Sequence, residues 1–288
     1  WYLDAGTRLG RTFEGFKQRW FHPKYNGFGV DPNKGSDAEI HERLKDICLS
    51  IEARDWFSLK EPIVNDIYVD LPVDARRHYA EMERDMFSQI GDSTVEAFGA
   101  AAMTNKCRQL AGGAVYIDAE VGSDDNSKSK KWKAVHNAKM EALDSCIEEA
   151  AGASMIVVYA FRSELARILK AYPGAVDLST KDGMKRFKSG DATLGAAHPA
   201  SLGHGVDGLQ AVCNVITHLG HDWALDTYQQ INERIGPVRQ MQSGLDRSVF
   251  VNRIIARDTL DEQVIERRLG KRTVQEMLLE AMKLRGRT

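Results

Sequence analysis

Short apolar runs alternate with longer amphipathic stretches through the second half of the chain. The apolar runs have the length of buried strands and lie at residues 155–160, 175–178, 193–198, 212–217 and 249–256. The amphipathic stretches suit helices and lie at residues 162–171, 182–188, 224–234 and 260 to about 284. This alternation predicts an α/β fold in which a doubly wound, mostly parallel sheet is flanked by helices. Ligands of such sheets bind at loops beyond the carboxyl ends of the strands, here the loops after residues 198 and 217.

The first half of the chain is predicted to be mainly helical. Residues 64–71 alternate apolar and polar side chains, as a half-buried strand does. Helices are predicted at residues 36–51, 72–90, 95–110 and 134–151. The polar run at residues 122–131 has the composition of a linker. We therefore expect three regions, which are residues 1–60, a helical linker region at 61–150 and a sheet-bearing region at 151–288.

Composition restricts the function classes without choosing one. The 288 residues are 43% hydrophobic and 28% charged, as in globular proteins, and the formal net charge of −2 excludes a globally basic nucleic-acid coat. No apolar run approaches the roughly 18 residues of a membrane span and no signal peptide is evident, so we expect a cytoplasmic protein. The chain begins with Trp1 instead of Met, which suggests a cut within a longer protein.

Two patterns indicate ligand sites only weakly. GHGVDG at residues 203–208 satisfies the G-x-G-x-x-G fingerprint of dinucleotide-binding oxidoreductases, yet only a turn or two of helix can follow it before the next strand. His198, His204, His218 and His221 fall near one predicted sheet edge, but no H-x-x-x-H pair lies on a helix, so we expect ordinary hydrogen-bonded histidines and no metal site. The four cysteines lack C-x-x-C spacing and are predicted to be reduced, buried thiols.

Three blocks of the second half carry a more specific pattern. They are HPASLGHGVDGLQ at 198–210, HDWALDTYQQINERIGPVRQ at 221–240 and VFVNRIIARDTLDEQVIERR at 249–268. In this order they resemble motif V, a Trp-bearing loop with motif VI, and the closing I-A-x-x-T-x-D-E signature of Swi/Snf-type superfamily-two DNA helicases and translocases. The matching residues are Gly203, Gly205, Leu209, Gln210, Trp223, Gln230, Arg234, Gln240, Ile255, Ala256, Thr259, Asp261 and Glu262. Residues 107–116 and 157–161 resemble the family's interlobe helix and motif IV strand, and similar sequences occur in its phage-type branch.

This resemblance implies a division of the chain into motor parts. Residues 151–288 would form the second, RecA-like lobe and end in a long helix. Residues 1–60 would be the part of the first lobe that follows motif III. In such motors nucleotide binds between the two lobes, and arginines of the second lobe neutralise charge that develops on the γ-phosphate.

Three residues of the motif VI block are the catalytic candidates. Arg234 is in register with the first motif VI arginine, and Gln230 would position it or sense nucleotide. The family's second arginine falls on Pro237, so Arg239 is the candidate for its replacement. Motif V departs as well, because residues 206–208 are inserted where the family has Leu-Asn.

The resemblance also implies ligands of the complete protein, namely ATP, Mg²⁺ and DNA, which would be double-stranded and bound without sequence preference. The loop residues assigned to ATP or nucleic acid are Gly203, His204, Gly205 and Gln210. Ser201 and Arg162 are assigned to the nucleic-acid backbone, and no residue is assigned to a metal.

Two motifs required for ATP hydrolysis are absent from the sequence, the G-x-x-x-x-G-K-[ST] phosphate loop and a D-E-x-H box. We therefore expect the chain to be inactive alone, to hold no cofactor stably and to depend on a missing N-terminal RecA-like lobe. The alternative is a catalytically silent RecA-like lobe that binds nucleic acid or a protein partner. The sequence does not separate unwinding from translocation, DNA from RNA, or one oligomeric state from another.

Overall fold

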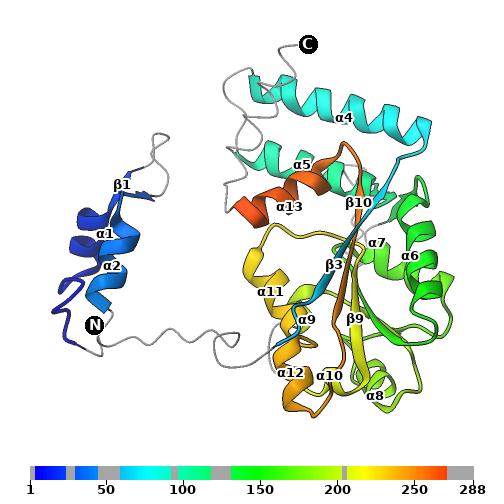
Figure 1. Cartoon of the computed structure of the whole chain (residues 1–288). Coiled ribbons are helices and arrows are strands. Elements are labelled where there is room, and N and C mark those ends of the chain that lie inside the picture. The colour runs from blue at the N-terminus through cyan, green and yellow to red at the C-terminus, as the bar shows by residue number, and fades with distance from the viewer. Residues whose placement is uncertain are drawn as a thin grey trace. The chain divides into compact units, whose positions relative to one another are not determined.

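A computed structural model describes residues 4–23, 30–44, 59–91, 97–117, 131–202 and 206–270 (Figure 1). It divides into two compact units, at residues 1–58 and 59–288. The predicted linker at 122–131 falls almost entirely outside the described residues, as does the part of the predicted C-terminal helix that follows residue 270. Within the described residues, no helix is long and apolar enough to cross a membrane.

The first unit is built around one tryptophan. Helices α1 (Phe13–Trp20) and α2 (Ser36–Leu44) accompany the antiparallel strands β1 (Phe21–Pro23) and β2 (Val30–Pro32). Trp20 is 1% exposed. The guanidinium groups of Arg19 and Arg43 lie 4.9 and 5.8 Å from its ring centroid, and Ser36 Oγ donates a hydrogen bond to its carbonyl oxygen at 2.7 Å.

The second unit contains a six-stranded parallel sheet, which confirms the predicted fold class. Its strand order is β3-β10-β9-β6-β8-β7. The strands are β3 (Ile63–Val69), β6 (Ser154–Val158), β7 (Val176–Asp177), β8 (Leu194–Ala197), β9 (Cys213–His218) and β10 (Phe250–Ala256). The edge strand β3 comes from the region predicted as a helical linker, and its seven residues pair in register with β10.

Alternating side chains of the sheet are buried on both faces, as parallel sheets require. On one face, Ile156 and Val158 pack with residues of α8 (Lys181–Ser189), α9 (Pro199–Leu202), α10 (Leu209–Val212) and α11 (Leu225–Glu233). On the other, Met155 and Val157 pack with residues of α6 (Ala138–Glu149) and α7 (Arg162–Ala171). Figure 1 shows α6 and α11 on opposite sides of the strands.

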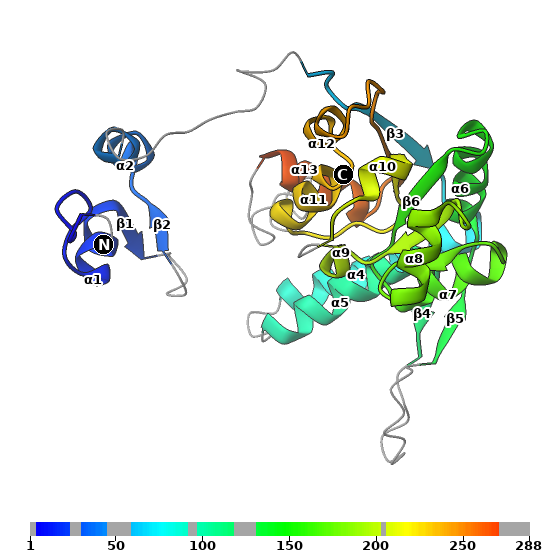
Figure 2. The ribbon, with the colours of Figure 1, turned by 90° about the horizontal axis from the view of Figure 1, so that it is seen from below.

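A third group of helices covers the end of the sheet where β3 and β10 finish. It consists of α4 (Val73–Gly91), α5 (Ala97–Ala111) and α13 (Leu260–Gly270), which share a core that includes Tyr79, Leu110 and Leu260. The strands β4 (Ala114–Tyr116) and β5 (Trp132–Ala134) form a small hairpin after α5 (Figure 2). Helix α12 (Pro237–Gln242) follows α11 directly and begins with proline at its first position, where a missing N–H costs nothing.

Candidate functional site

The loop that joins α9 to α10 is held by an arginine at the end of α11. Arg234 Nε donates to the carbonyl oxygen of Leu202 at 2.8 Å, and its Nη1 donates to that of Val206 at 2.9 Å. The two carbonyls lie on either side of residues 203–205, so one guanidinium joins both ends of that segment. Gly203, His204 and Gly205, all predicted site residues, lie outside the described residues.

A second arginine reaches the same loop from α12. Arg239 Nη1 forms an ion pair with Asp207 Oδ1, and its side chain is 31% exposed, against 75% for Asp207. The turn at Gly236 and Pro237 starts α12 and thereby sets the direction from which Arg239 approaches. The structure therefore brings Arg234 and Arg239 to one loop, the loop that contains the motif V resemblance.

A buried amide network fixes the base of this loop. Gln240 is 1% exposed and donates to the carbonyl oxygens of Cys213 and Ile235 at 2.9 and 3.0 Å. Arg247 Nε donates to Gln240 Oε1 at 2.8 Å, and its Nη2 donates to the carbonyl oxygen of Gln210 at 2.5 Å. The carbonyl oxygen of Gln210, another predicted site residue, is thus used to anchor the loop.

The remaining predicted site residues lie elsewhere. Gln230 is exposed on α11. Ser201 Oγ donates to the carbonyl oxygen of His198 at 2.7 Å, within its own turn. Arg162 is exposed at the first position of α7, which packs on the other face of the sheet from α11. The structure therefore does not bring Ser201, Gln230 and Arg162 together around Arg239.

The closing signature has a structural role that its residues explain. Asp261 Oδ2 forms an ion pair with Lys139 Nζ of α6 at 2.5 Å, with side chains only 4% and 2% exposed. Asp261 also accepts a hydrogen bond from the Ala256 N–H at 3.1 Å, and Thr259 Oγ1 donates to the Ala256 carbonyl oxygen at 2.8 Å. These contacts begin α13 and tie it to the sheet.

Two of the clustered histidines are buried hydrogen-bond donors. Burial lowers the pKa of His218 to about 3 and the pKa of His221 well below its ordinary value. Their Nε2 atoms lie 2.8 Å from Asn232 Oδ1 and 2.7 Å from the carbonyl oxygen of Ile254, so each neutral ring carries its proton on Nε2. Among the described residues, no group of three or more His, Cys, Asp or Glu side chains could hold a metal ion.

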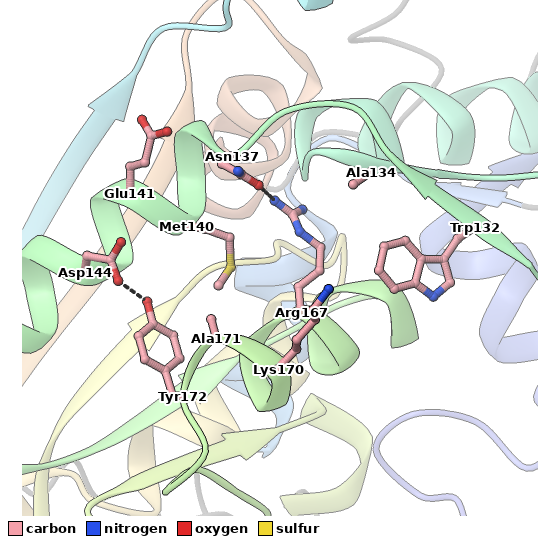
Figure 3. A pocket seen from close by; sticks show the side chains of 10 residues that line it. All are labelled: Trp132, Ala134, Asn137, Met140, Glu141, Asp144, Arg167, Lys170, Ala171 and Tyr172. Atoms are coloured by element: carbon pink, nitrogen blue, oxygen red, sulfur yellow. Dashed lines mark hydrogen bonds between the residues drawn. The ribbon is translucent and has the colours of Figure 1, made fainter.

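A pocket of about 420 Å³ opens on the opposite face of the sheet, between α6, α7 and β5 (Figure 3). Tyr172 donates to Asp144 Oδ1 at 2.6 Å within it. Arg167 also lines it, and its guanidinium is engaged by the carbonyl oxygens of Gly112 and His136 at 2.7 Å each. The buried cation of the pocket, Arg167, is already hydrogen-bonded, and no residue that lines the pocket belongs to the three motif blocks, so we assign the pocket no role in the motor site.

Three residues near the loop were missed by sequence reasoning. Lys188 is the second-last residue of α8, Asp207 lies in the insertion that departs from the motif V pattern, and Arg247 follows α12. The insertion at residues 206–208 could have pointed to Asp207, because a departure from the motif pattern within a matching loop indicates that the contacts of the loop differ. No local signal points to Lys188 or Arg247, because their partners come from distant parts of the chain.

The sequence of the chain is similar to that of one curated phage protein. No protein-family profile matches the chain. It is 44% identical over 288 residues to protein p41 of Acyrthosiphon pisum secondary endosymbiont phage 1, covering 98% of this chain and 60% of that protein. The chain thus spans less than two thirds of the length of this curated relative.

Solved structures with the same fold are Swi2/Snf2 ATPase domains. The C-terminal part of the Fun30 ATPase domain is 12% identical, with a TM-score of 0.53 over 72% of this chain and 89% of that one. The Sulfolobus solfataricus SWI2/SNF2 ATPase core in complex with dsDNA is 18% identical, with a TM-score of 0.52 over 92% of this chain and 55% of that one. The sheet and its helices therefore have the RecA-like fold of Snf2 C-terminal lobes.

Proposed function

We propose that this chain is the C-terminal motor lobe of an ATP-dependent Swi/Snf-type DNA helicase or translocase of the phage-like branch. The observation that carries the proposal is that the segments resembling motifs V and VI, far apart in sequence, meet through Arg234 and Arg239 on a RecA-like sheet. The 44% identity to a phage protein supports assignment to the phage-like branch.

Arg239 is the group best suited to nucleotide. Its guanidinium is partly exposed and already binds one carboxylate oxygen, so it can bind an anionic phosphate oxygen in the same way. Bound ATP would supply the phosphoanhydride bond, and Arg239 would neutralise charge on the transferred phosphoryl group. Arg234 bonds two carbonyl oxygens and would position the loop, while Gln230 is exposed on α11 and would sense nucleotide in the two-lobed protein.

Mg²⁺ and the phosphate-cradling loop would come from a first lobe, because the sequence has neither the Gly-Lys-Thr loop nor the D-E-x-H carboxylate. ATP and Mg²⁺ are thus ligands of the two-lobed protein in this proposal. The missing N-terminal RecA-like lobe is the partner that completes the site.

Duplex DNA is the proposed polymer substrate. One structural neighbour was solved with dsDNA, which supports the same substrate class here. Arg162, exposed at the start of α7, and Ser201 of α9 are the proposed backbone contacts. Contacts to phosphates predict binding that depends little on sequence and weakens steeply as salt is raised.

The test is DNA-stimulated ATP hydrolysis by this chain and by a form extended upstream through a phosphate-binding loop. We expect turnover only in the extended form, stimulated by duplex DNA. Hydrolysis by neither form, with DNA still bound by the chain, would instead support a catalytically silent nucleic-acid-binding lobe.

A further inference from the structure

The exposed carboxylate of Asp207 lies among positively charged groups from two separate elements. Arg239 of α12 is its ion-pair partner. Lys188, near the end of α8, approaches the neighbouring residue, because its Nζ lies 3.8 Å from where a Cβ of Gly208 would stand. A hydrogen bond from the Gly208 backbone N–H lowers the pKa of Asp207 most, and the charge of Arg239, a hydrogen bond from Gln210 and the charge of Lys188 lower it further.

The surroundings of this carboxylate have the chemistry of a phosphate site. A guanidinium pairs with two oxygens of a phosphate as it does with two oxygens of a carboxylate, and a lysine ammonium adds a point charge. Helix α8, which carries Lys188, is basic overall, because it has four exposed cations against one exposed acid; the cations are Lys181, Lys185, Arg186 and Lys188. The anion that pairs with Arg239 is a carboxylate of the chain itself.

We propose that Lys188 and Arg239 form a phosphate-binding site whose resting occupant is the Asp207 carboxylate, which an incoming phosphate group displaces. The source of that phosphate, nucleotide or DNA backbone, rests on the proposed function. The existence of the site does not rest on the proposed function, because the side chains of Lys188, Asp207 and Arg239 all belong to this chain.

The strength of the internal contact suits displacement. An ion pair with one member 75% exposed changes an affinity by only about 1.5- to 5-fold, because water and salt screen it. A doubly charged phosphate therefore competes effectively with Asp207 for Arg239, and the nearby charge of Lys188 favours it further. Side-chain rotation of Asp207 is sufficient to vacate the site.

The experiment titrates the chain with inorganic phosphate, with Mg-ATP and with a short DNA duplex, and follows the backbone amide signal of Gly208 by NMR. Asp207→Asn keeps the shape and removes the charge, so we expect it to bind phosphate about 1.5- to 5-fold more tightly. Lys188→Gln and Arg239→Gln should each weaken binding. Asp74→Asn is the matched control, because Asp74 is also exposed and ion-paired, to Arg77 on α4 at 3.3 Å.

The outcomes separate this inference from the proposed function. Tighter binding in Asp207→Asn with Mg-ATP assigns the site to nucleotide, and tighter binding only with duplex assigns it to the DNA backbone. Unchanged or weaker phosphate binding in Asp207→Asn, or no effect of Lys188→Gln, overturns the inference. Tighter phosphate binding together with no ATP hydrolysis in the extended protein would leave the site standing and reject the motor.

Discussion

Buried charged side chains connect parts of the chain that are far apart in sequence. Lys139 and Asp261 are 2% and 4% exposed, and Lys139 Nζ also donates to the carbonyl oxygen of Leu219 at 3.0 Å. The pair therefore joins α6, α13 and the loop after β9. The family signature includes Asp261, but only the structure shows that its carboxylate forms an ion pair with a buried lysine.

Removing one partner of this pair should be costly. We expect Lys139→Met to lower the free energy of unfolding by about 3–5 kcal/mol, because it leaves Asp261 charged and unpaired in the core. The double variant Lys139→Met/Asp261→Asn should regain much of that loss. Urea unfolding measures both, with the exposed Lys170→Met as control. A loss under about 1 kcal/mol in Lys139→Met would contradict the buried pair.

The buried histidines predict acid sensitivity. The pKa of His218 in the folded state is about 3, below the ordinary value of 6.5 that applies when the chain is unfolded. As pH falls through 6.5, the unfolded chain takes up a proton that the folded chain does not, so stability falls by up to about 1.4 kcal/mol per pH unit until about pH 3.

Urea unfolding between pH 8 and pH 4 measures this dependence. His218→Gln should reduce the slope, leaving the contribution of His221, whereas replacement of the exposed His78 by Gln should leave the slope unchanged. Equal slopes in the wild type and His218→Gln would show that His218 is not the group responsible.

At the scale of elements, periodicity predicted the strands well and the short helices poorly. Strands β6 to β10 coincide with the apolar runs of the sequence, because both of their faces are buried. Helix α7 coincides with a predicted amphipathic stretch, because one of its faces is buried against the sheet. The sequence alone therefore predicts these elements. Helices α9, α10 and α12 have only four to six residues, and the hairpin β4–β5 has three-residue strands. Such elements are stabilised by tertiary contacts such as those of Arg234 and Gln240, which no local pattern contains.

The loop anchor gives an element-scale prediction. Arg234→Lys keeps the charge, but a single ammonium cannot reproduce the guanidinium geometry that spans Leu202 and Val206. We expect it to lower the free energy of unfolding by about 1–3 kcal/mol. The exposed Arg186→Lys on α8 is the control. A stability equal to wild type would contradict the expectation that the two carbonyl contacts anchor the loop.

At the scale of the whole molecule, the sequence predicted the α/β sheet, the order of the motif blocks and their resemblance to a motor lobe. It could not predict that β3, from the region expected to be a helical linker, completes the sheet beside β10, because that pairing joins residues about 190 positions apart. Nor could it predict which side chains face the motif loop. The Arg239–Asp207 pair depends on the turn at Gly236 and Pro237, which the family pattern lacks.

The central claim is that this lobe contributes Arg239 to ATP hydrolysis. Steady-state ATP turnover with saturating duplex DNA, in the form extended through a phosphate-binding loop, tests it most directly. We predict that Arg239→Ala lowers kcat by about a thousandfold or more with little change in stability, while Arg77→Ala on α4 leaves it unchanged. A kcat for Arg239→Ala within about threefold of wild type would contradict the account.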